Sequence, residues 1–308
     1  MAPVRQGQSA LDTVNERLLN GQIALAIDDL ADDLIARRLE EPDSWQAYAK
    51  ACLEHPVRAL LHQDPFTYRA FSKPRGYAGD AVMMDYIYGL GEAAEAASNA
   101  TPLGRAIFEH NSTRPSSCAV RYRREMIASL IDRVGERPDA RVLAIAAGHL
   151  REVELSSAMR TGKIQDFLAF DQDEASLALV DRDYARLGVR TMPGSVRHIL
   201  QGTAKLGQFD FVYAAGLFDY LNAQAAAALT CRMFEMTRPG GMMLIPNFLT
   251  GVADSGYMEA FMDWRLIYRN HADMQALAAA LPKAAVEHCQ VFDDSHDAVT
   301  YLLVSKVR

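Results

Sequence analysis

The sequence has little of what marks secreted, membrane-spanning or nucleic-acid-binding proteins. Its four cysteines are scattered without a C-x-x-C pair, which predicts reduced thiols, a cytoplasmic protein and no metal site. No apolar run reaches the roughly 18 residues that span a membrane, and the N-terminus lacks the basic-then-apolar pattern of a signal peptide. The net charge of −7 argues against binding dominated by phosphate contacts, so we expect no nucleic-acid partner.

What the chain does contain falls into two patterns that meet near residue 137. Before that point, apolar residues recur at helical spacing and no strand is evident. The connector 136–140 is polar and contains Pro138. We therefore expect a helical N-terminal lid or substrate region over 1–137 and a second domain over 138–308. Helices are expected at 11–38, 44–61, 81–88 and 119–134.

The first of these helical stretches carries an apolar stripe from Leu11 to Ile35. Such a stripe can support a homodimer, and packing inside the N-terminal region explains it equally well. Both interpretations stay open at this point.

After residue 138, strand-like and helical stretches alternate, which predicts a parallel sheet with helices on both faces. Only residues 293–298 separate the last two strands, too few for a crossover helix, so the last strand should run antiparallel. The predicted class is α/β, a Rossmann-like seven-stranded sheet with an antiparallel last strand, preceded by a helical N-terminal region. Strands are expected at 141–146, 166–170, 189–192, 209–214, 241–246, 286–292 and 299–306, and helices at 151–160, 174–187, 222–237 and 257–281.

Two strand ends in this second domain point to a nucleoside cofactor. The strand at 141–146 ends in small residues, reaches Gly148 and changes to helical spacing, as a buried parallel strand does beside a nucleotide-sized ligand. The next strand ends in Asp171, whose carboxylate can accept hydrogen bonds from both ribose hydroxyls. His149, beside the turn, is either a base near neutral pH or a residue that holds the turn.

Five segments in order resemble the motifs of class I S-adenosylmethionine (SAM)-dependent methyltransferases: 146–148, Asp171, 193–196, 209–216 and 238–241. The resemblance implies SAM as the cofactor. The residues expected around it are Tyr77, Ala146, Gly148, His149, Asp171, Gln172, Ser195, Val196, Ala214, Ala215 and Gly216. The chain departs from the family at Ala144, where an acidic residue is usual, and in having a single glycine where several are usual. The missing glycines also count against NAD or FAD.

A narrower resemblance rests on 73–84, 147–152 and 262–269. These segments are similar to a bacterial subgroup that includes 3-hydroxypalmitic acid methyl ester biosynthesis proteins. They are also similar to methyltransferases of guanidino or keto-acid metabolites. The resemblance implies methylation of a small molecule and does not choose the substrate.

Three residues are candidates for catalysis. The loop within 71–88 is rich in glycine, proline and polar side chains, and loops of this kind often bind ligands. We interpret it as a lid, with Arg75 facing a carboxylate and Tyr77 lining the methyl-transfer channel; the alternative is a turn between helices. Tyr220, after the fourth strand, either orients the nucleophile or packs against the next helix.

Candidate substrate-binding residues come from two more segments. Arg123 belongs to the basic run 121–124, which is either a solvated helix surface or an anion site, because guanidinium groups pair well with carboxylates. Trp264, Tyr268 and Arg269 lie in a stretch with helical spacing, where the two aromatic residues form either a substrate wall or part of the core.

These observations favour a SAM-dependent methyltransferase of a small-molecule acceptor. An acidic metabolite such as a hydroxy fatty acid carboxylate is preferred, because arginines crowd the expected site. The alternative within the class is N-methylation of an amino or guanidino metabolite. Two alternatives lie outside the class of methyltransferases. One is an NAD(P)-dependent oxidoreductase, and the other is a non-catalytic partner protein with the SAM fold.

Overall fold

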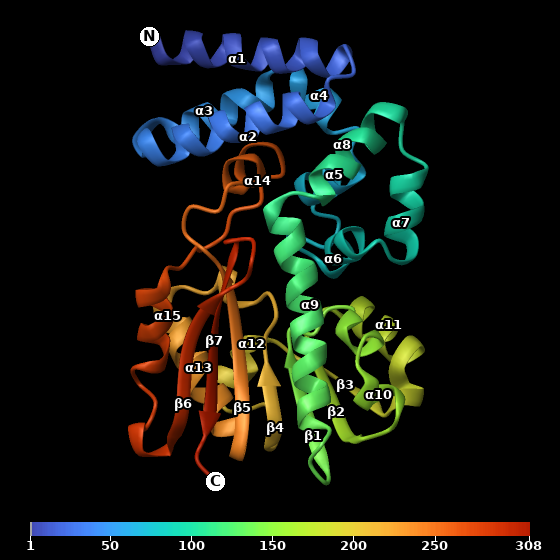
Figure 1. The fold of residues 1–308 in the computed structure, drawn as a ribbon, viewed down its shortest axis with the longest axis vertical. Coiled ribbons are helices and arrows are strands. Elements are labelled where there is room, and N and C mark those ends of the chain that lie inside the picture. The colour runs from blue at the N-terminus through green and yellow to red at the C-terminus, as the bar shows by residue number, and fades with distance from the viewer. Residues whose placement is uncertain (1) are drawn as a thin grey trace. The chain divides into compact units, whose positions relative to one another are not determined.

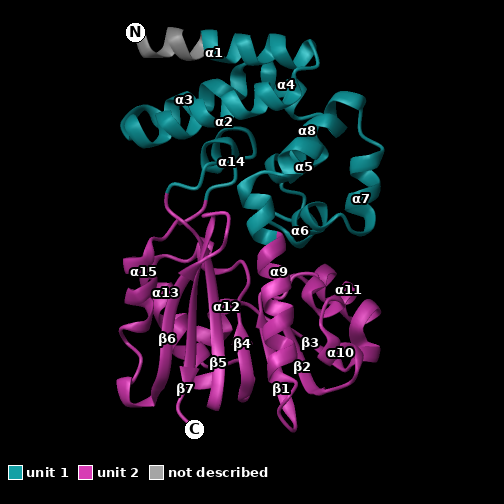
Figure 2. Ribbon diagram, in the orientation of Figure 1, with its two compact units in different colours: residues 1–120, 251–265 teal, residues 121–250, 266–308 magenta. Residues whose placement is uncertain are grey.

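The computed structural model describes residues 2–308, with side chains from residue 9 onward. The chain forms two compact units, coloured separately in Figure 2. Unit 1 contains the residues up to Val120 and the later segment 251–265, and unit 2 contains 121–250 and 266–308. This division differs from the sequence-based boundary at residue 137. Helix α9 (Pro115–Val134) continues unbroken through the change of unit, and a continuous helix shows no shift of pattern there.

Unit 1 is built of helices joined by short turns. Gly21, with a φ of +74°, turns the chain and divides the predicted helix 11–38 in two. The predicted helix 81–88 is confirmed, and the Asp80 side chain caps it by accepting from the Met83 N–H. The helices are α1 (Ala2–Leu19), α2 (Ile23–Glu40), α3 (Pro42–Glu54), α4 (Val57–Leu61), α5 (Pro65–Ser72), α6 (Ala81–Tyr88), α7 (Gly91–Ser98), α8 (Pro102–Ser112), the start of α9, and α14 (Ser255–Phe261).

The apolar stripe of the first two helices is buried inside unit 1. Leu11 and Leu18 of α1 are buried, as are Ile27, Leu30 and Leu34 of α2, and the two helices pack together. Internal packing therefore accounts for the stripe. A homodimer stays a prediction, without support from this surface.

Helix α14 belongs to unit 1 although it follows the central strands in sequence. All its residues are buried, and it packs on α2 and α3. A side-chain carbon on Gly256 would lie 2.7 Å from atoms of Leu34, so only glycine permits this approach. The Glu259 carboxylate accepts hydrogen bonds from Arg38 Nε at 2.8 Å and Trp45 Nε1 at 2.7 Å.

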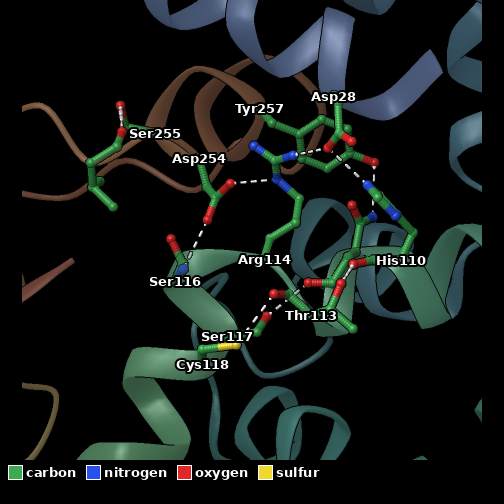
Figure 3. A network of polar contacts seen from close by, with 12 residues as sticks. Asp28, His110, Thr113, Arg114, Ser116, Ser117, Cys118, Asp254, Ser255 and Tyr257 are labelled. Carbon is green, nitrogen blue, oxygen red and sulfur yellow. Dashed lines mark hydrogen bonds and ion pairs between the residues drawn. The ribbon is translucent and has the colours of Figure 1, made fainter. Parts of the chain in front are cut away.

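A polar network fixes the chain where α14 begins (Figure 3). Arg114 donates to Asp254 and also to Asp28, which His110 contacts as well. The second Asp254 oxygen accepts the Ser116 N–H at 2.8 Å. These bonds hold the segment against α2 and the start of α9 within unit 1.

Unit 2 is built on one sheet, with the strand order β3-β2-β1-β4-β5-β7-β6 (Figure 1). Strand β7 is antiparallel to both of its neighbours, and the remaining pairs are parallel, which confirms the predicted fold class. The strands are β1 (Ala140–Ile145), β2 (Ile164–Asp171), β3 (Val189–Pro193), β4 (Phe209–Tyr213), β5 (Thr237–Phe248), β6 (Val286–Asp293) and β7 (Val299–Lys306).

Helices cover both faces of this sheet. Figure 1 shows the lower part of α9 in front of it and α12 and α13 behind it. Leu143 of β1 and Val212 of β4 share a buried cluster with Leu229 and Met233 of α13. No helix among residues 2–308 has the length and apolarity needed to cross a membrane. The helices and 3₁₀ turns of unit 2, besides the rest of α9, are η1 (Arg151–Glu154), α10 (Ser157–Arg160), α11 (Glu174–Tyr184), η2 (Ala185–Leu187), α12 (Val196–Leu200), η3 (Phe218–Tyr220), α13 (Ala223–Met236), α15 (His271–Ala278) and η4 (Lys283–Ala285).

The predicted continuous helix over 257–281 is wrong. Helix α14 stops at Phe261, Asp263 takes a φ of +45°, and the chain does not resume helical structure until His271. Backbone bonds to other elements replace the helical ones: the Ile267 N–H donates to Asp219 O at 2.7 Å, and the Arg269 N–H to Phe248 O at 3.0 Å. Trp264 and Tyr268 therefore do not share a helical face.

Candidate functional site

The topology of unit 2 creates one edge suited to a ligand. From β1 the chain proceeds through β2 to β3 on one side, while β4 and β5 lie on the other. The carboxyl ends of β1 and β4 are therefore neighbours at the point where the strand order reverses, and open α/β sheets bind ligands there. The predicted cofactor residues of unit 2 end or follow β1, β2, β3 or β4, so they lie at the carboxyl ends of these strands.

The turn after β1 is tightly bent. Ala146, Gly148 and Leu150 take positive φ values of 52°, 54° and 52°. Such conformations are costly for residues other than glycine and often accompany binding sites. The Gly148 N–H donates to Asp171 Oδ2 at 2.8 Å, and the Ala147 N–H donates to Phe170 O at 3.3 Å. Strand β2 therefore fixes the shape of the turn.

Asp171 ties three loops together at this edge. Besides the bond from Gly148, its Oδ1 accepts the Asp173 N–H at 2.8 Å, and its backbone carbonyl accepts the Gly194 N–H at 2.8 Å. Each carboxylate oxygen has two lone pairs, so one acceptor site on each stays available for a ribose hydroxyl. Gln172, the next residue, is exposed.

The loop after β3 is set by local bonds. The Ser195 N–H donates to His198 Nδ1 at 3.1 Å, part of a capping box that starts α12. Val196 packs against the main apolar cluster. A side-chain carbon on Gly194 would lie 2.5 Å from the Phe170 ring, so this position requires glycine.

At the ends of β1 and β4, a buried carboxylate meets a buried tyrosine. Tyr213, the last residue of β4, donates its hydroxyl proton to Glu152 Oε1 at 2.5 Å. Burial raises the pKa of Glu152 above its ordinary value, while the Tyr213 hydroxyl and the charges of Arg123 and Arg124 oppose that rise. His149 is buried beside the same turn.

Arg123 reaches the carboxyl end of β4. Its guanidinium lies 3.8 Å from where a side-chain carbon on Gly216 would stand, and the residue is 5% exposed. Arg124 donates to the Arg151 carbonyl at 2.9 Å and to Glu154 at 2.6 Å. The solvated-surface interpretation is therefore wrong for these two arginines. Ala214, Ala215 and Gly216, which follow β4, have small side chains, and Gly216 lies next to Arg123.

Asp219 and Arg269 form a second polar group at this end of the sheet. Asp219 Oδ1 accepts the Phe248 N–H at 2.8 Å. Burial raises the pKa of Asp219 to about 6, against the effects of the Phe248 N–H and of the arginines Arg123 and Arg269. Arg269 donates to Phe218 O at 2.7 Å, and also to Leu221 O and Asn247 Oδ1.

The predicted substrate and catalytic residues are divided between the two units. The guanidinium of Arg269 is engaged by backbone and amide oxygens, so its observed role is to hold the loop after β4. Tyr220 is 40% exposed, which argues against simple core packing. Tyr268 lies in unit 2, whereas Arg75, Tyr77 and Trp264 lie in unit 1. The roles predicted for these residues stay predictions.

The pairing of Glu152 with Tyr213 was not foreseen from the sequence. The available signal was an acidic residue directly after a sharply turned buried strand. Its partner could not be identified because Tyr213 lies 61 residues further along the chain, on another strand.

Comparison with known proteins gives a likeness of fold. No protein-family model matches the chain, and no curated protein matches its sequence. The structure is similar to a possible exported protein from Bordetella parapertussis, at 14% identity, over 84% of this chain and 97% of that one, with a TM-score of 0.55. At this identity the likeness establishes the fold alone.

Two further structures are methyltransferases. The N-methyltransferase NodS from Bradyrhizobium japonicum, in complex with S-adenosyl-L-homocysteine (SAH), is 13% identical over 64% of this chain and 90% of that one, with a TM-score of 0.45. The 1,6-didemethyltoxoflavin-N1-methyltransferase of Burkholderia thailandensis is 15% identical over 76% of this chain and 91% of that one, with a TM-score of 0.44. At TM-scores below 0.5, neither likeness carries weight for function.

Proposed function

We propose that this chain is a SAM-dependent methyltransferase acting on a small molecule. The observation that carries the proposal is the edge at the ends of β1, β2 and β4. There a turn with positive φ angles at Ala146, Gly148 and Leu150 is held by Asp171, and small residues follow β4. The residues fit the cofactor: Asp171, which ends β2 beside this turn, would hold the ribose hydroxyls. Ser195 and Val196, after β3, would line the adenine side.

When bound, the cofactor supplies a methyl group on an already activated sulfonium. The protein therefore has to align the acceptor and exclude water. Ala214, Ala215 and Gly216 would leave room for the methyl group and the acceptor atom. Arg75 and Tyr77 are proposed to close over the site as a lid.

The preferred acceptor is a carboxylate, such as that of a hydroxy fatty acid, methylated on oxygen. Arg123 supports this choice, because it is a buried guanidinium beside the small residues after β4. A carboxylate is already a nucleophile and needs no base.

A second candidate, N-methylation of an amino or guanidino metabolite, is favoured by Asp219. The pKa of this buried carboxyl is raised to about 6, which suits a group that accepts a proton near neutral pH. An amine acceptor must lose a proton, so it needs such a group.

Calorimetric titration with SAH and with NADH tests the cofactor. Micromolar SAH binding is expected, whereas NADH binding in its place would promote an oxidoreductase. SAH binding without turnover of any acceptor would indicate a non-catalytic partner protein. The lid is tested by Tyr77→Phe and Arg75→Ala, and unchanged affinity and turnover in both variants would exclude it.

The acceptor class is tested by mass spectrometry of a panel of hydroxy fatty acids, amines and guanidines. Asp219→Asn then separates the two chemistries. The variant should lower the turnover of an amine acceptor by roughly tenfold or more. The turnover of a carboxylate acceptor should stay within about twofold of the wild-type value. The opposite pattern would reject the assignment of the proton acceptor.

A further inference from the structure

Two helices of unit 1 end at residues with a costly backbone conformation. Helix α5 ends at Lys73, which has a φ of +49°, and Asp263 takes a φ of +45° just after α14. Helices commonly place glycine at such left-handed positions, as α6 does with Gly89, because side chains disfavour them. A lysine and an aspartate in these places indicate that their side chains are needed.

The two side chains bind each other. The Lys73 ammonium donates to Asp263 Oδ2 and forms an ion pair, although the residues are 190 positions apart. The other oxygen of Asp263 accepts from Arg265 Nε at 3.4 Å, and Arg265 also donates to Gln46 of α3. Asp263 is therefore connected to α3, and Lys73 is connected to Asp263, all within unit 1.

Lys73 also begins the turn that contains Arg75. Its carbonyl accepts the Gly76 N–H at 2.8 Å, which closes a β-turn over residues 73–76. Pro74 occupies the second position, where its fixed φ suits a turn, and Arg75 occupies the third. One residue thus both closes the turn around Arg75 and attaches it to Asp263.

The far end of the same loop is held more firmly. The Asp80 carboxylate accepts from Arg69 Nε at 3.1 Å and Nη2 at 2.7 Å, and it also caps α6 through the Met83 N–H. Asp80 is fully buried, whereas the side chains of Lys73 and Asp263 are 32% and 38% exposed. A bidentate buried pair is strong, while an exposed pair is weak and is screened by salt. The loop therefore has one firm attachment and one that can be released.

We propose that Lys73 and Asp263 are positioning residues, whose ion pair is a clasp that holds the turn around Arg75 in its ligand-binding form. The clasp acts on the ligand only through this turn. Its release lets the turn open for the ligand to enter or leave, and its formation restores the turn. This inference rests on the proposed function, in which Arg75 and Tyr77 close over the SAM site.

Hydrogen exchange of the Gly76 amide measures the turn directly, because this N–H closes it. The experiment uses the full chain without ligand. Lys73→Met and Asp263→Asn each remove one charge and keep the size of the side chain, so Gly76 exchange should become roughly two- to fivefold faster. Lys73→Glu should have a larger effect, because it places two like charges together. The exchanged pair Lys73→Glu/Asp263→Lys should restore slow exchange.

Two controls accompany these variants. Lys50→Met removes another lysine of unit 1, which pairs with Glu54 at 3.9 Å within α3, and it should leave Gly76 exchange unchanged. The Met83 amide, which Asp80 accepts at the firm end of the loop, is the internal reference and should not respond to the variants.

Salt provides a test on the wild type, independent of whether any variant folds. Raising sodium chloride from about 0.05 M to about 1 M should speed the exchange of Gly76 relative to Met83, because salt screens the exposed ion pair. In Lys73→Met the same change of salt should leave the ratio constant. A wild-type ratio that does not respond to salt would contradict the clasp.

Titration with SAH then tests the role in binding. The Kd for SAH should rise across the variants in the order of their Gly76 exchange rates, by up to about fivefold, because only the closed turn binds. Lys73→Glu/Asp263→Lys should bind as the wild type does, and so should Lys50→Met.

The outcomes separate this inference from the proposed function. If Gly76 exchange ignores the charges at Lys73 and Asp263, the clasp is wrong. If exchange follows them while the Kd for SAH stays constant, the pair is merely structural, and the inference is wrong while the methyltransferase assignment stands. If the wild type does not bind SAH, the proposed function fails, and the role of the clasp in binding fails with it.

Discussion

At the amino end of β2, Asp166 accepts hydrogen bonds from Arg141 at 2.7 Å and from Arg190 at 2.6 Å. At the carboxyl end of the same strand, Asp171 accepts instead from the backbone N–H groups of Gly148 and Asp173. Burial tends to raise the pKa of Asp166, but the two arginines outweigh it and lower the pKa.

The other carboxylates repeat the contrast. Near the amino end, Asp210 pairs with Arg238 at 2.9 Å and accepts the Arg141 N–H. Near the carboxyl end, Glu152 and Asp219 have raised pKa values, because burial outweighs their few hydrogen bonds. Asp166 and Asp210 are thus paired with arginines through direct hydrogen bonds, whereas burial dominates the pKa of Glu152 and Asp219. This asymmetry matches the rule that open α/β sheets bind ligands at the carboxyl ends of their strands.

The largest expected effect comes from Arg269, which holds the loop after β4 at the carboxyl end of the sheet. Arg269→Met would leave the oxygens of Phe218, Leu221 and Asn247 without their donor, so the free energy of unfolding should fall by about 3 kcal/mol. Chemical denaturation measures this loss. Arg190→Met at the amino end is the control, with an expected loss of about 1 kcal/mol or less, because that arginine is 56% exposed. Similar losses of stability in Arg269→Met and Arg190→Met would contradict the structural role of Arg269.

Next in size is the effect of Asp171 on cofactor binding. Asp171→Ala removes the acceptor that holds the Gly148 turn, and SAH affinity should fall roughly 100-fold, or about 3 kcal/mol. Isothermal titration calorimetry measures it. Asp166→Asn, on the same strand, should leave the affinity within about threefold. A loss of binding in both variants would mean that β2 acts only through stability.

Asp219 predicts a dependence of stability on pH. Its pKa in the fold, about 6, lies above the ordinary 3.8, so the folded state binds the proton more tightly than the unfolded one. The contribution of Asp219 to stability is therefore present at low pH and is lost as the pH rises from about 4 to about 6.

Denaturant titrations across this range measure it. Relative to the wild type, the free energy of unfolding of Asp219→Asn should increase by roughly 2 kcal/mol between pH 4 and pH 7. A pKa unit corresponds to about 1.4 kcal/mol. Asp64 of unit 1, whose pKa burial also raises to about 6, contributes to both proteins and cancels in the difference. A constant difference would show that Asp219 titrates normally.

The smallest effect belongs to Asp166, and it has the opposite sign. Because its pKa is lowered in the fold, its ion pairs stabilise the protein above the ordinary pKa, and this contribution is lost as the pH falls through the lower value. Asp166→Asn should cost about 1 kcal/mol at pH 7, since its partners are partly exposed. The difference in free energy of unfolding between the wild type and Asp166→Asn should be smaller at pH 3. A larger difference at pH 3 would show that the pKa of Asp166 is not lowered in the fold.

The sequence anticipates the ligand-binding edge better than the substrate side. The turn at Gly148 and the strand end at Asp171 are local features, since an apolar run, a small-residue turn and a terminal acid can be read within a few residues. Their meeting at one edge follows from the alternation of strands and helices. The antiparallel β7 follows from the short connection before it.

The segment 251–269 illustrates what the sequence does not determine. Its apolar spacing predicts a helix, and α14 forms, but Trp264 and Tyr268 lie in the non-helical stretch that follows. Backbone bonds from Ile267 to Asp219 of η3 and from Arg269 to Phe248 of β5 outweigh the local preference. The inclusion of α14 in unit 1 depends on packing with α2 and on the bonds that Glu259 accepts, which no local pattern reveals.

By itself, the sequence determined the class of the sheet, the direction of its last strand and the carboxylate at the end of β2. These depend on periodicity, connection length and turn chemistry, which act over short stretches of chain. The tertiary structure alone decided that Glu152 meets Tyr213, that Arg123 is buried near Gly216, and that Arg269 holds a loop. The partners in these contacts come from different elements, and hydrogen bonding and burial depend on which groups the fold brings together.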